Sequence, residues 1–150
     1  MQAGEVVGIY LHGPKAEALR SVQEANAVPG CGLEGDRMFR RQAGRLQPDQ
    51  ELTLIEAEAI EAVKRETGIA LLPGQPRRQL VIRNIRLNEL VDREFQIGEV
   101  RVHGQRLCQP CDHLESLTQP GVKAAYHHRG GLRARILTSG TIRVGDAVVS

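Results

Sequence analysis

Short β-prone segments separated by glycine-containing turns constrain the fold of this chain more than any other feature. The clearest example is residues 94–103 (EFQIGEVRVH), where apolar and polar residues alternate on both sides of Gly98-Glu99. Alternation of this kind is typical of strands with one buried face, and a Gly-X pair between two such runs is typical of a type II′ hairpin turn. The segment therefore predicts a β-hairpin.

Several other segments have the same short, branched and apolar character. Leu132, Ala134 and Ile136 alternate with arginines, and the turn pairs Ser139-Gly140 and Gly145-Asp146 delimit two strands near the C-terminus. Residues 19–27 fit either a strand or a short helix, and residues 40–49 fit a loop or a weak edge strand. Further strands are expected at residues 5–12, 80–82, 141–144 and 147–149.

One segment has the period of a helix instead. Between residues 52 and 67 (LTLIEAEAIEAVKRET), apolar residues recur at helical spacing, and Gly68 follows where a C-terminal capping glycine belongs. Residues 120–128 begin with proline and predict a short helix, and residues 88–91 predict a helical turn. One clear helix and one or two short ones are expected.

Many short strands with few helices predict a mainly β fold, built as a small barrel or a curled sheet. A chain of 150 residues has the length of one domain and buries roughly 68–70% of its unfolded surface. Neither an internal repeat nor a shift in composition divides the sequence. Residues 1–150 are therefore expected to form a single domain.

Composition argues against several classes of partner. A net charge of +2 and an aromatic content of 3% are too low for a nucleic-acid-binding surface with stacking platforms. The sequence has no run of about 18 apolar residues and no signal-like N-terminus. Three cysteines do not form a disulfide framework, and they fit a reducing compartment. We expect a cytoplasmic protein that binds neither nucleic acid nor membrane.

Two segments combine arginine with residues suited to anion binding. Residues 32–37 (GLEGDR) contain glycines that let backbone N–H groups approach an anion, and Arg37 adds a charged fork; the alternative is a tight structural turn. Arg83 follows an apolar strand and can bind phosphate, while Asn84 can hydrogen-bond a heterocycle; the alternative is a solvated strand end. Arg77, Arg78 and Arg86 are expected in solvent.

The thiol pair in residues 108–113 (CQPCDH) allows several chemistries. Cys108 and Cys111 have the spacing of a redox pair, of half a zinc site, or of a thiolate that binds a soft metal or carries sulfur. No convincing helix follows the motif, which disfavours the redox interpretation. A zinc site would need further ligands from Cys31, His113, His127 or His128. Two thiols packed as small apolar groups are the structural alternative.

A fourth polar segment, residues 126–131 (YHHRGG), follows the short predicted helix. Its histidines can titrate near neutral pH or ligate a metal. The alternative is a helix C-terminus at which His and Arg interact favourably with the helix dipole. Arginine lies beside glycine or asparagine in three of the four segments, which together with the thiols would form a pocket for an anionic, sulfur-reactive ligand.

These motifs resemble, in order, those of the MOSC family, named for the C-terminal part of molybdenum cofactor sulfurases. The resemblance extends over residues 4–149 and implies a β-barrel-like fold of the MOSC or pyruvate-kinase-barrel type. Eight motifs carry it: residues 32–37, 53–63, 83–85, 87–90, 95–99, 108–115, 128–132 and 140–146.

The resemblance also implies a function. Cys111 matches the cysteine that ligates molybdenum or carries sulfur in such proteins. Small members resemble sulfur carriers or molybdenum-cofactor-dependent reductases of N-hydroxylated compounds, which would require an electron-donor or sulfur-donor protein. The residues that match the cofactor-binding positions are Arg83 and Asn84 for the pterin and its phosphate, Gly35, Asp36 and Arg37 for the loop that borders the pocket, and Arg129, Gly130 and Gly131 for its rim.

The sequence departs from the family pattern at Met38, where histidine is expected, and at Cys108, an additional thiol that would resolve a persulfide or simply pack. A chain of 150 residues cannot contain the pyridoxal-phosphate desulfurase domain of larger relatives. Four hypotheses follow: a molybdenum-cofactor oxidoreductase, a non-catalytic persulfide carrier, a zinc-stabilised binding module, and a structural domain whose pocket has decayed.

Overall fold

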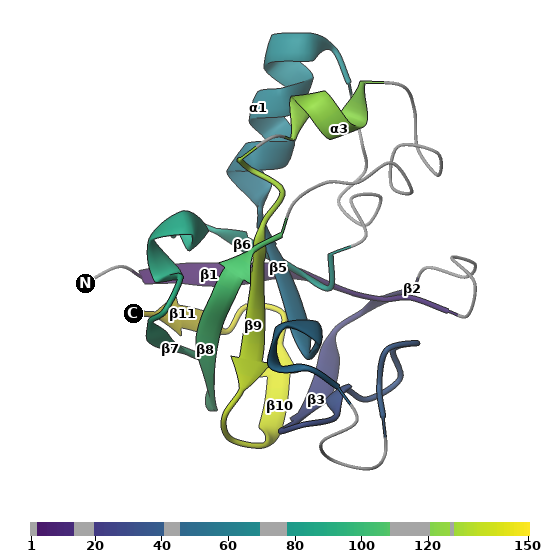
Figure 1. The fold of residues 1–150 in the computed structure, drawn as a ribbon, viewed down its shortest axis with the longest axis vertical. Coiled ribbons are helices and arrows are strands. Elements are labelled where there is room, and N and C mark those ends of the chain that lie inside the picture. The colour runs from purple at the N-terminus through teal and green to yellow at the C-terminus, as the bar shows by residue number, and fades with distance from the viewer. Residues whose placement is uncertain (1–2, 14–19, 41–45, 70–77, 109–120, 127) are drawn as a thin grey trace.

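The computed structural model describes residues 3–13, 20–40, 46–69, 78–108, 121–126 and 128–150. Within these residues, seven strands form a closed barrel, because β1 pairs with β6 on one side and with β11 on the other. Figure 1 shows the barrel below the main helix. In order around the barrel, the strands are β1 (Ala3–Leu11), β11 (Ala147–Val149), β7 (Glu94–Ile97), β8 (Val100–Leu107), β9 (Leu132–Ile136), β5 (Leu52–Glu56) and β6 (Leu80–Arg83).

The barrel strands pair antiparallel except at one place. β5 and β6 are parallel, with Leu54 opposite Leu80 and Glu56 opposite Ile82. A parallel pair needs a long crossover connection, and the helix α1 (Ala57–Thr67) lies in this one. The predicted hairpin is confirmed as β7 and β8, with Ile97 opposite Val100.

A small second sheet lies beside the barrel. It contains β10 (Gly140–Arg143), β3 (Glu24–Val28) and β4 (Gly32–Leu33). The strand β2 (Arg20–Val22) pairs with the end of β1. Residues 19–27 fitted either a strand or a short helix, and the described part of that segment forms two short strands.

The start of the main helix differs from the prediction. Residues 52–56 form β5, and α1 begins only at Ala57. Leu52 and Leu54 belong to the barrel cluster while Ile55 belongs to the cluster beneath α1, so the strand buries residues on both faces and its alternation breaks at Leu54-Ile55. The cap at the other end is confirmed: Gly68 has φ 77°, and its N–H donates to the Lys64 carbonyl at 2.9 Å.

The other helices of the described residues are short. They are the 3-10 turns η2 (Pro48–Gln50) and η3 (Leu87–Leu90) and the single-turn helix α3 (Val122–Ala125). The expected class, a mainly β barrel with one clear helix and short ones, is confirmed. Among the described helices, none is long and apolar enough to cross a membrane.

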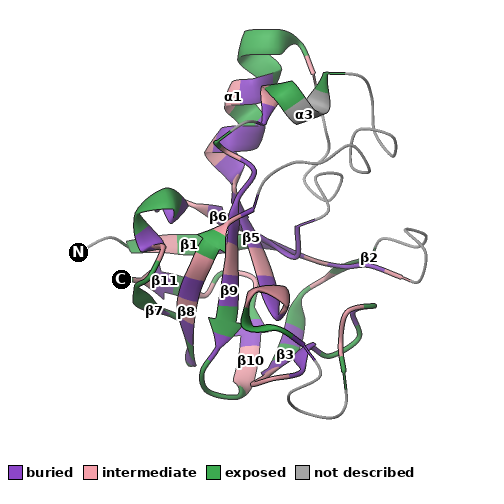
Figure 2. Cartoon of the chain, in the orientation of Figure 1, coloured by how far each residue is buried: buried purple, intermediate pink, exposed green. Residues whose placement is uncertain are grey.

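Two apolar clusters stabilise the fold, and both are visible as buried segments in Figure 2. The larger cluster fills the barrel and includes Leu54, Leu80 and Ile82. The smaller one lies outside the barrel wall, where Val63 of α1 packs near Val81 of β6. Because successive residues of a strand point to opposite faces, β6 contributes Leu80 and Ile82 to one cluster and Val81 to the other.

Candidate functional site

Cys108, the first residue of the thiol motif, meets the Gly130–Gly131 loop at one end of the barrel. Cys108 follows β8, is 1% exposed, and donates its backbone N–H to the Gly131 carbonyl at 2.7 Å. Gly131 has φ 109°, and a Cβ placed there would lie 2.0 Å from the Leu54 carbonyl oxygen. Only glycine permits this approach of the loop to β5. Cys111, the predicted metal or sulfur ligand, lies outside the described residues.

A buried arginine binds the same loop. Arg78 is 8% exposed, and its Nε donates to the Gly130 carbonyl at 2.8 Å. The expectation that Arg78 lies in solvent is therefore wrong. A charged side chain is rarely buried unless it is hydrogen-bonded, and here the acceptor comes from a segment 52 residues away in the sequence. The only signal in the sequence was its place immediately before a buried strand.

Residues 32–37, the glycine loop, are connected to this region by contacts with the end of β1. The Tyr10 N–H donates to the Gln79 carbonyl at 2.8 Å, which extends the β1–β6 pairing to the residue next to Arg78. Two residues further on, His12 contacts Asp36 of the loop. The loop, the buried arginine, the Gly130–Gly131 segment and Cys108 therefore form one continuous series of contacts.

Asp36 is the residue around which the loop folds. One of its carboxylate oxygens accepts the His12 backbone N–H at 2.8 Å and lies 3.3 Å from Nδ1 of His12; the other accepts the Met38 N–H at 3.0 Å. Burial alone would raise the pKa of Asp36, but the hydrogen bonds from His12 and Met38 outweigh it and lower that pKa below its ordinary 3.8. Asp36 is therefore a structural anchor, held as a carboxylate.

The backbone amides of this loop are already used within the protein. The N–H groups of residues 34, 36, 37, 39 and 40 donate to backbone carbonyls, and that of Met38 donates to Asp36. Gly35 has φ 94°, and its carbonyl accepts a hydrogen bond from Arg20 at 3.2 Å. The loop is thus a folded turn, and attraction for an anion is left to the Gly35 N–H and to side chains such as that of the exposed Arg37.

Arg83 and Asn84 lie at the other end of β6, about 10 Å along the strand from Leu80. The Arg83 guanidinium binds Glu61 of α1 through two contacts, Nη2–Oε2 at 2.5 Å and Nη1–Oε1 at 3.3 Å. This pairing lowers the pKa of Glu61 and raises that of Arg83. Asn84 has φ 68° and donates its N–H to Glu58 at 2.8 Å. Carboxylates therefore already bind both residues.

Arg129 anchors the rim loop to the helices. Its Nε donates to the Ala125 carbonyl at 2.9 Å, and its Nη1 lies 3.2 Å from Glu66 of α1. From the other side, the Asn88 amide donates to the His128 carbonyl at 2.9 Å. Together these contacts fix the segment that presents Gly130 and Gly131 to Arg78 and Cys108.

An unpartnered polar atom lies in the same series of contacts. His12 is 5% exposed, and within the described part of the chain its Nε2 has no hydrogen-bond partner. A buried ring nitrogen without a partner costs free energy, and such atoms are found where a ligand supplies the missing partner. Among the described side chains, no group of three or more His, Cys, Asp or Glu residues could hold a metal ion.

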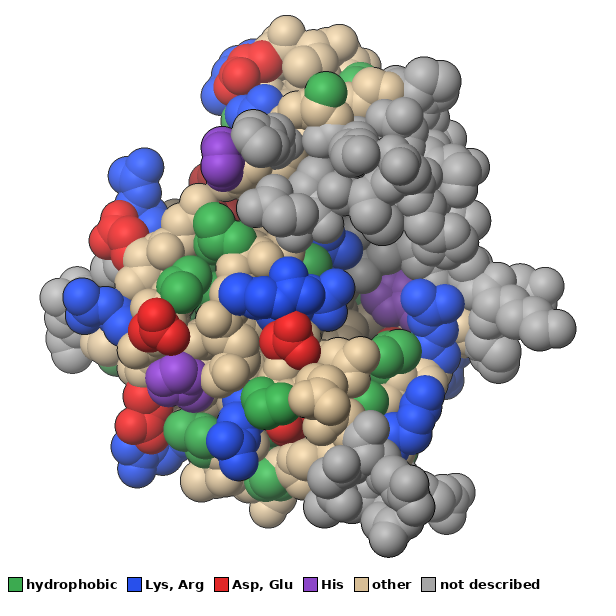
Figure 3. Space-filling view, viewed as in Figure 1, with side chains coloured by type: hydrophobic (Ala, Val, Ile, Leu, Met, Phe, Trp, Pro, Cys, Tyr) green, Lys and Arg blue, Asp and Glu red, His purple; other side chains and the backbone are tan. Residues whose placement is uncertain are grey.

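Charges of both signs are mixed on the face seen in Figure 3. Arg106 pairs with Asp49 at 2.7 Å, and Arg133 donates to the Asp49 carbonyl at 3.2 Å. The described side chains on this face therefore form no single-sign basic stripe of the kind that follows a nucleic-acid backbone.

The family follows from comparison with known sequences. The MOSC domain profile matches residues 41–149, most of the chain. The protein belongs to the MOSC domain family, as the order of its motifs predicted. A search of curated proteins finds no match to this sequence.

Solved structures share the fold at low sequence identity. YuaD from Bacillus subtilis is 15% identical with a TM-score of 0.80, and the match covers 99% of this chain and 97% of YuaD. YiiM from Geobacillus stearothermophilus is 17% identical with a TM-score of 0.73, covering 97% and 74% of the two chains. YiiM from Escherichia coli is also 17% identical, with a TM-score of 0.69 and coverage of 99% and 69%. These similarities establish the fold alone.

Proposed function

We propose that this MOSC protein binds a molybdenum cofactor at the end of the barrel that holds Cys108, Gly131 and Arg78, with Cys111 as its thiolate ligand. One observation carries the proposal: the Gly130–Gly131 loop accepts hydrogen bonds from both the thiol segment and a buried arginine. A soft thiolate can ligate the metal of such a cofactor, and a buried cation can bind the anionic phosphate of its pterin.

The residues present fit such a group in three respects. Arg78 adds positive charge where little water screens it. The unpartnered Nε2 of His12 can accept or donate a hydrogen bond to a buried ligand. Arg37 of the glycine loop and Arg20 of β2, which donates to the Gly35 carbonyl, add positive charge, while Arg129 fixes the opposite rim.

When bound, the cofactor would supply the redox-active metal for reduction of N-hydroxylated compounds, with electrons from a separate donor protein. The chain's own residues would hold and orient it. The hydrogen bond between Cys108 and Gly131 holds the loop against the first residue of the thiol motif, and Asp36 fixes the glycine loop through His12.

The burial of Cys108 bears on the role of the second thiol. A cysteine that resolves a persulfide by thiol–disulfide exchange must be accessible as a thiolate. Cys108 is 1% exposed and free of disulfide bonds. This supports a packing role for Cys108 and chemistry at Cys111 alone.

The test is elemental analysis with intact-protein mass spectrometry, on protein purified from a host that makes molybdenum cofactor. Wild type is expected to carry close to one molybdenum atom per chain, Cys111→Ser to carry none, and Cys108→Ala to retain it. A Cys111-dependent mass gain of one sulfur without molybdenum would replace the proposal by a persulfide carrier. Zinc in wild type and Cys111→Ser alike would also overturn it.

A further inference from the structure

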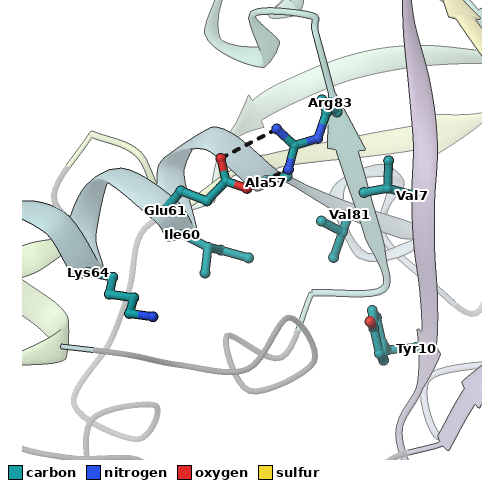
Figure 4. A pocket seen from close by; sticks show the side chains of 8 residues that line it. All are labelled: Val7, Tyr10, Ala57, Ile60, Glu61, Lys64, Val81 and Arg83. Carbon is teal, nitrogen blue, oxygen red and sulfur yellow. Dashed lines mark hydrogen bonds and ion pairs between the residues drawn. The ribbon is translucent and has the colours of Figure 1, made fainter.

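A second concave site lies outside the barrel, between α1 and the wall formed by β1 and β6. It has a volume of about 260 Å³, slightly smaller than the roughly 300–1,000 Å³ of sites for drug-sized ligands. Figure 4 shows its lining from three separate elements. The lining residues are Val7 and Tyr10 of β1, Ala57, Ile60, Glu61 and Lys64 of α1, and Val81 and Arg83 of β6.

The floor of this site is apolar and open to solvent on one side. Ile60 and Val81 belong to the cluster beneath α1, and Tyr10 packs against the edge of that cluster. Val7 is 37% exposed, one of two large apolar side chains among the described residues with that much exposure. An apolar floor that ends in an exposed valine leaves hydrophobic surface uncovered, which burial of a ligand's apolar part would stabilise.

The rim of the site carries one unbalanced positive charge. Its charged side chains are Glu61, Lys64 and Arg83, and the first pairs with the last through two contacts. Within the described part of the chain, the Lys64 ammonium has no ion pair. Glu5 and Glu58 also act on Arg83 electrostatically, but neither lines the site.

We propose that this site binds a small amphiphilic monoanion, an aliphatic or aromatic carboxylate, with its apolar part on Ile60, Val81 and Val7 and its carboxylate at Lys64. Figure 4 shows Lys64 and Tyr10 on opposite sides of the apolar floor, so the Tyr10 hydroxyl is available as a second polar contact. The proposal is independent of molybdenum cofactor binding and involves neither Cys111 nor Arg78.

The state of Arg83 favours a carboxylate over a phosphate. Arginine binds phosphate best when its fork of donors is open, and here Glu61 occupies that fork. A phosphate dianion would have to displace Glu61 and leave that carboxylate unpaired beside it. A monoanion at Lys64 needs no such exchange, because it neutralises the one remaining positive charge of the rim.

The experiment is a calorimetric titration with sodium octanoate, 1-octanol, octylamine and inorganic phosphate, each with the full-length protein. Octanoate is expected to bind more tightly than octanol, and octylamine and phosphate are expected not to bind. If octanol or octylamine binds more tightly than octanoate, Lys64 does not bind a carboxylate there and the proposal is wrong. Binding of inorganic phosphate that depends on Arg83 would show a phosphate site in place of a carboxylate site and would overturn the proposal.

Matched variants test the placement of the ligand. Lys64→Met keeps the apolar stem and is expected to weaken octanoate binding about fivefold, the effect of losing about 1 kcal/mol of ion pairing at an exposed site. Arg65→Met is the control: Arg65 is exposed and does not line the site, although it acts electrostatically on Glu61, so its loss should weaken binding much less than Lys64→Met does. Val7→Glu adds a carboxylate at an exposed position and should abolish binding.

Two results separate this site from the cofactor site. Cys111→Ser should bind octanoate as wild type does, even if it has lost molybdenum. Equal weakening by Lys64→Met and Arg65→Met, or unchanged binding in Val7→Glu, would show that octanoate binds elsewhere and would overturn the proposal.

Discussion

Two arginines at opposite ends of β6 lie in contrasting environments. Arg78, before β6, is 8% exposed and hydrogen-bonds a neutral backbone carbonyl. The side chain of Arg83, at the end of β6, is 39% exposed and binds the Glu61 carboxylate. A carbonyl acceptor leaves the charge of a guanidinium intact, whereas a carboxylate neutralises it. The bond to Gly130 therefore does not cancel the charge of Arg78, whereas the bond to Glu61 cancels that of Arg83 under α1.

This difference shows how the two regions can serve different ligands. The end with Cys108 combines a buried cation, a tightly fixed glycine loop and a His12 nitrogen that has no hydrogen-bond partner among the described residues. The side beneath α1 combines an apolar floor with Lys64, which forms no ion pair with any described residue. The first suits a multiply charged, metal-bearing cofactor, and the second suits a small amphiphile.

The largest effect is expected from Gly131→Ala. Its Cβ would lie 2.0 Å from the Leu54 carbonyl oxygen at a positive φ, so both a backbone clash and backbone strain arise. We expect the free energy of unfolding to fall by about 3 kcal/mol or more, measured by urea denaturation. The clash should also displace the Gly131 carbonyl and so break its hydrogen bond with the Cys108 N–H.

Gly145→Ala is the matched control for this change. Gly145 has φ 98°, and a Cβ there would meet nothing within 4 Å. The variant should therefore be destabilised only by the strain of alanine at a positive φ, about 1 kcal/mol. Equal losses in the two variants would mean that the close approach of Gly131 to β5 is unimportant.

The sequence predicted best what depends on neighbouring residues. The β7–β8 hairpin and the Gly68 cap follow from alternation and from glycine at fixed places, and both were found. The segment 52–56 was misassigned to a helix because β5 buries residues on both faces: Ile55 follows Leu54 directly, and its spacing to Ala59 and Ile60 is helical.

Arg78 was missed for a different reason. Its burial depends on a carbonyl at Gly130, which no local pattern reveals. The family resemblance singled out Arg83 and Asn84, yet Glu61 and Glu58 are the residues that bind them in the fold. Sequence patterns thus identified Cys108 and the Gly130–Gly131 loop, which meet at one end of the barrel, but not the buried arginine that binds this loop. The roles of Cys111, Arg83 and Asn84 remain predictions.

The second prediction separates the two arginines directly. Arg78→Met should lower the free energy of unfolding by about 1–3 kcal/mol, because the buried Gly130 carbonyl loses its donor. Arg83→Met removes a solvent-exposed ion pair and should cost no more than about 1 kcal/mol. Chemical denaturation measures both, and molybdenum content should fall in the first variant alone. A greater loss of molybdenum in Arg83→Met would mean that Arg83, and not Arg78, binds the cofactor phosphate, and would contradict the difference drawn between the two arginines.

The smallest effect concerns the core beneath α1. Tyr126 is 1% exposed, and in the described part of the chain its hydroxyl has no hydrogen-bond partner; burial raises its pKa to about 12. Tyr126→Phe removes the unpartnered hydroxyl while keeping the ring, so we expect a gain of about 1 kcal/mol in thermal or urea denaturation. Tyr10→Phe, at the edge of the same cluster, should change stability little. A loss of stability in Tyr126→Phe would mean that the hydroxyl has a polar partner and that this core is not the purely apolar support of the second site.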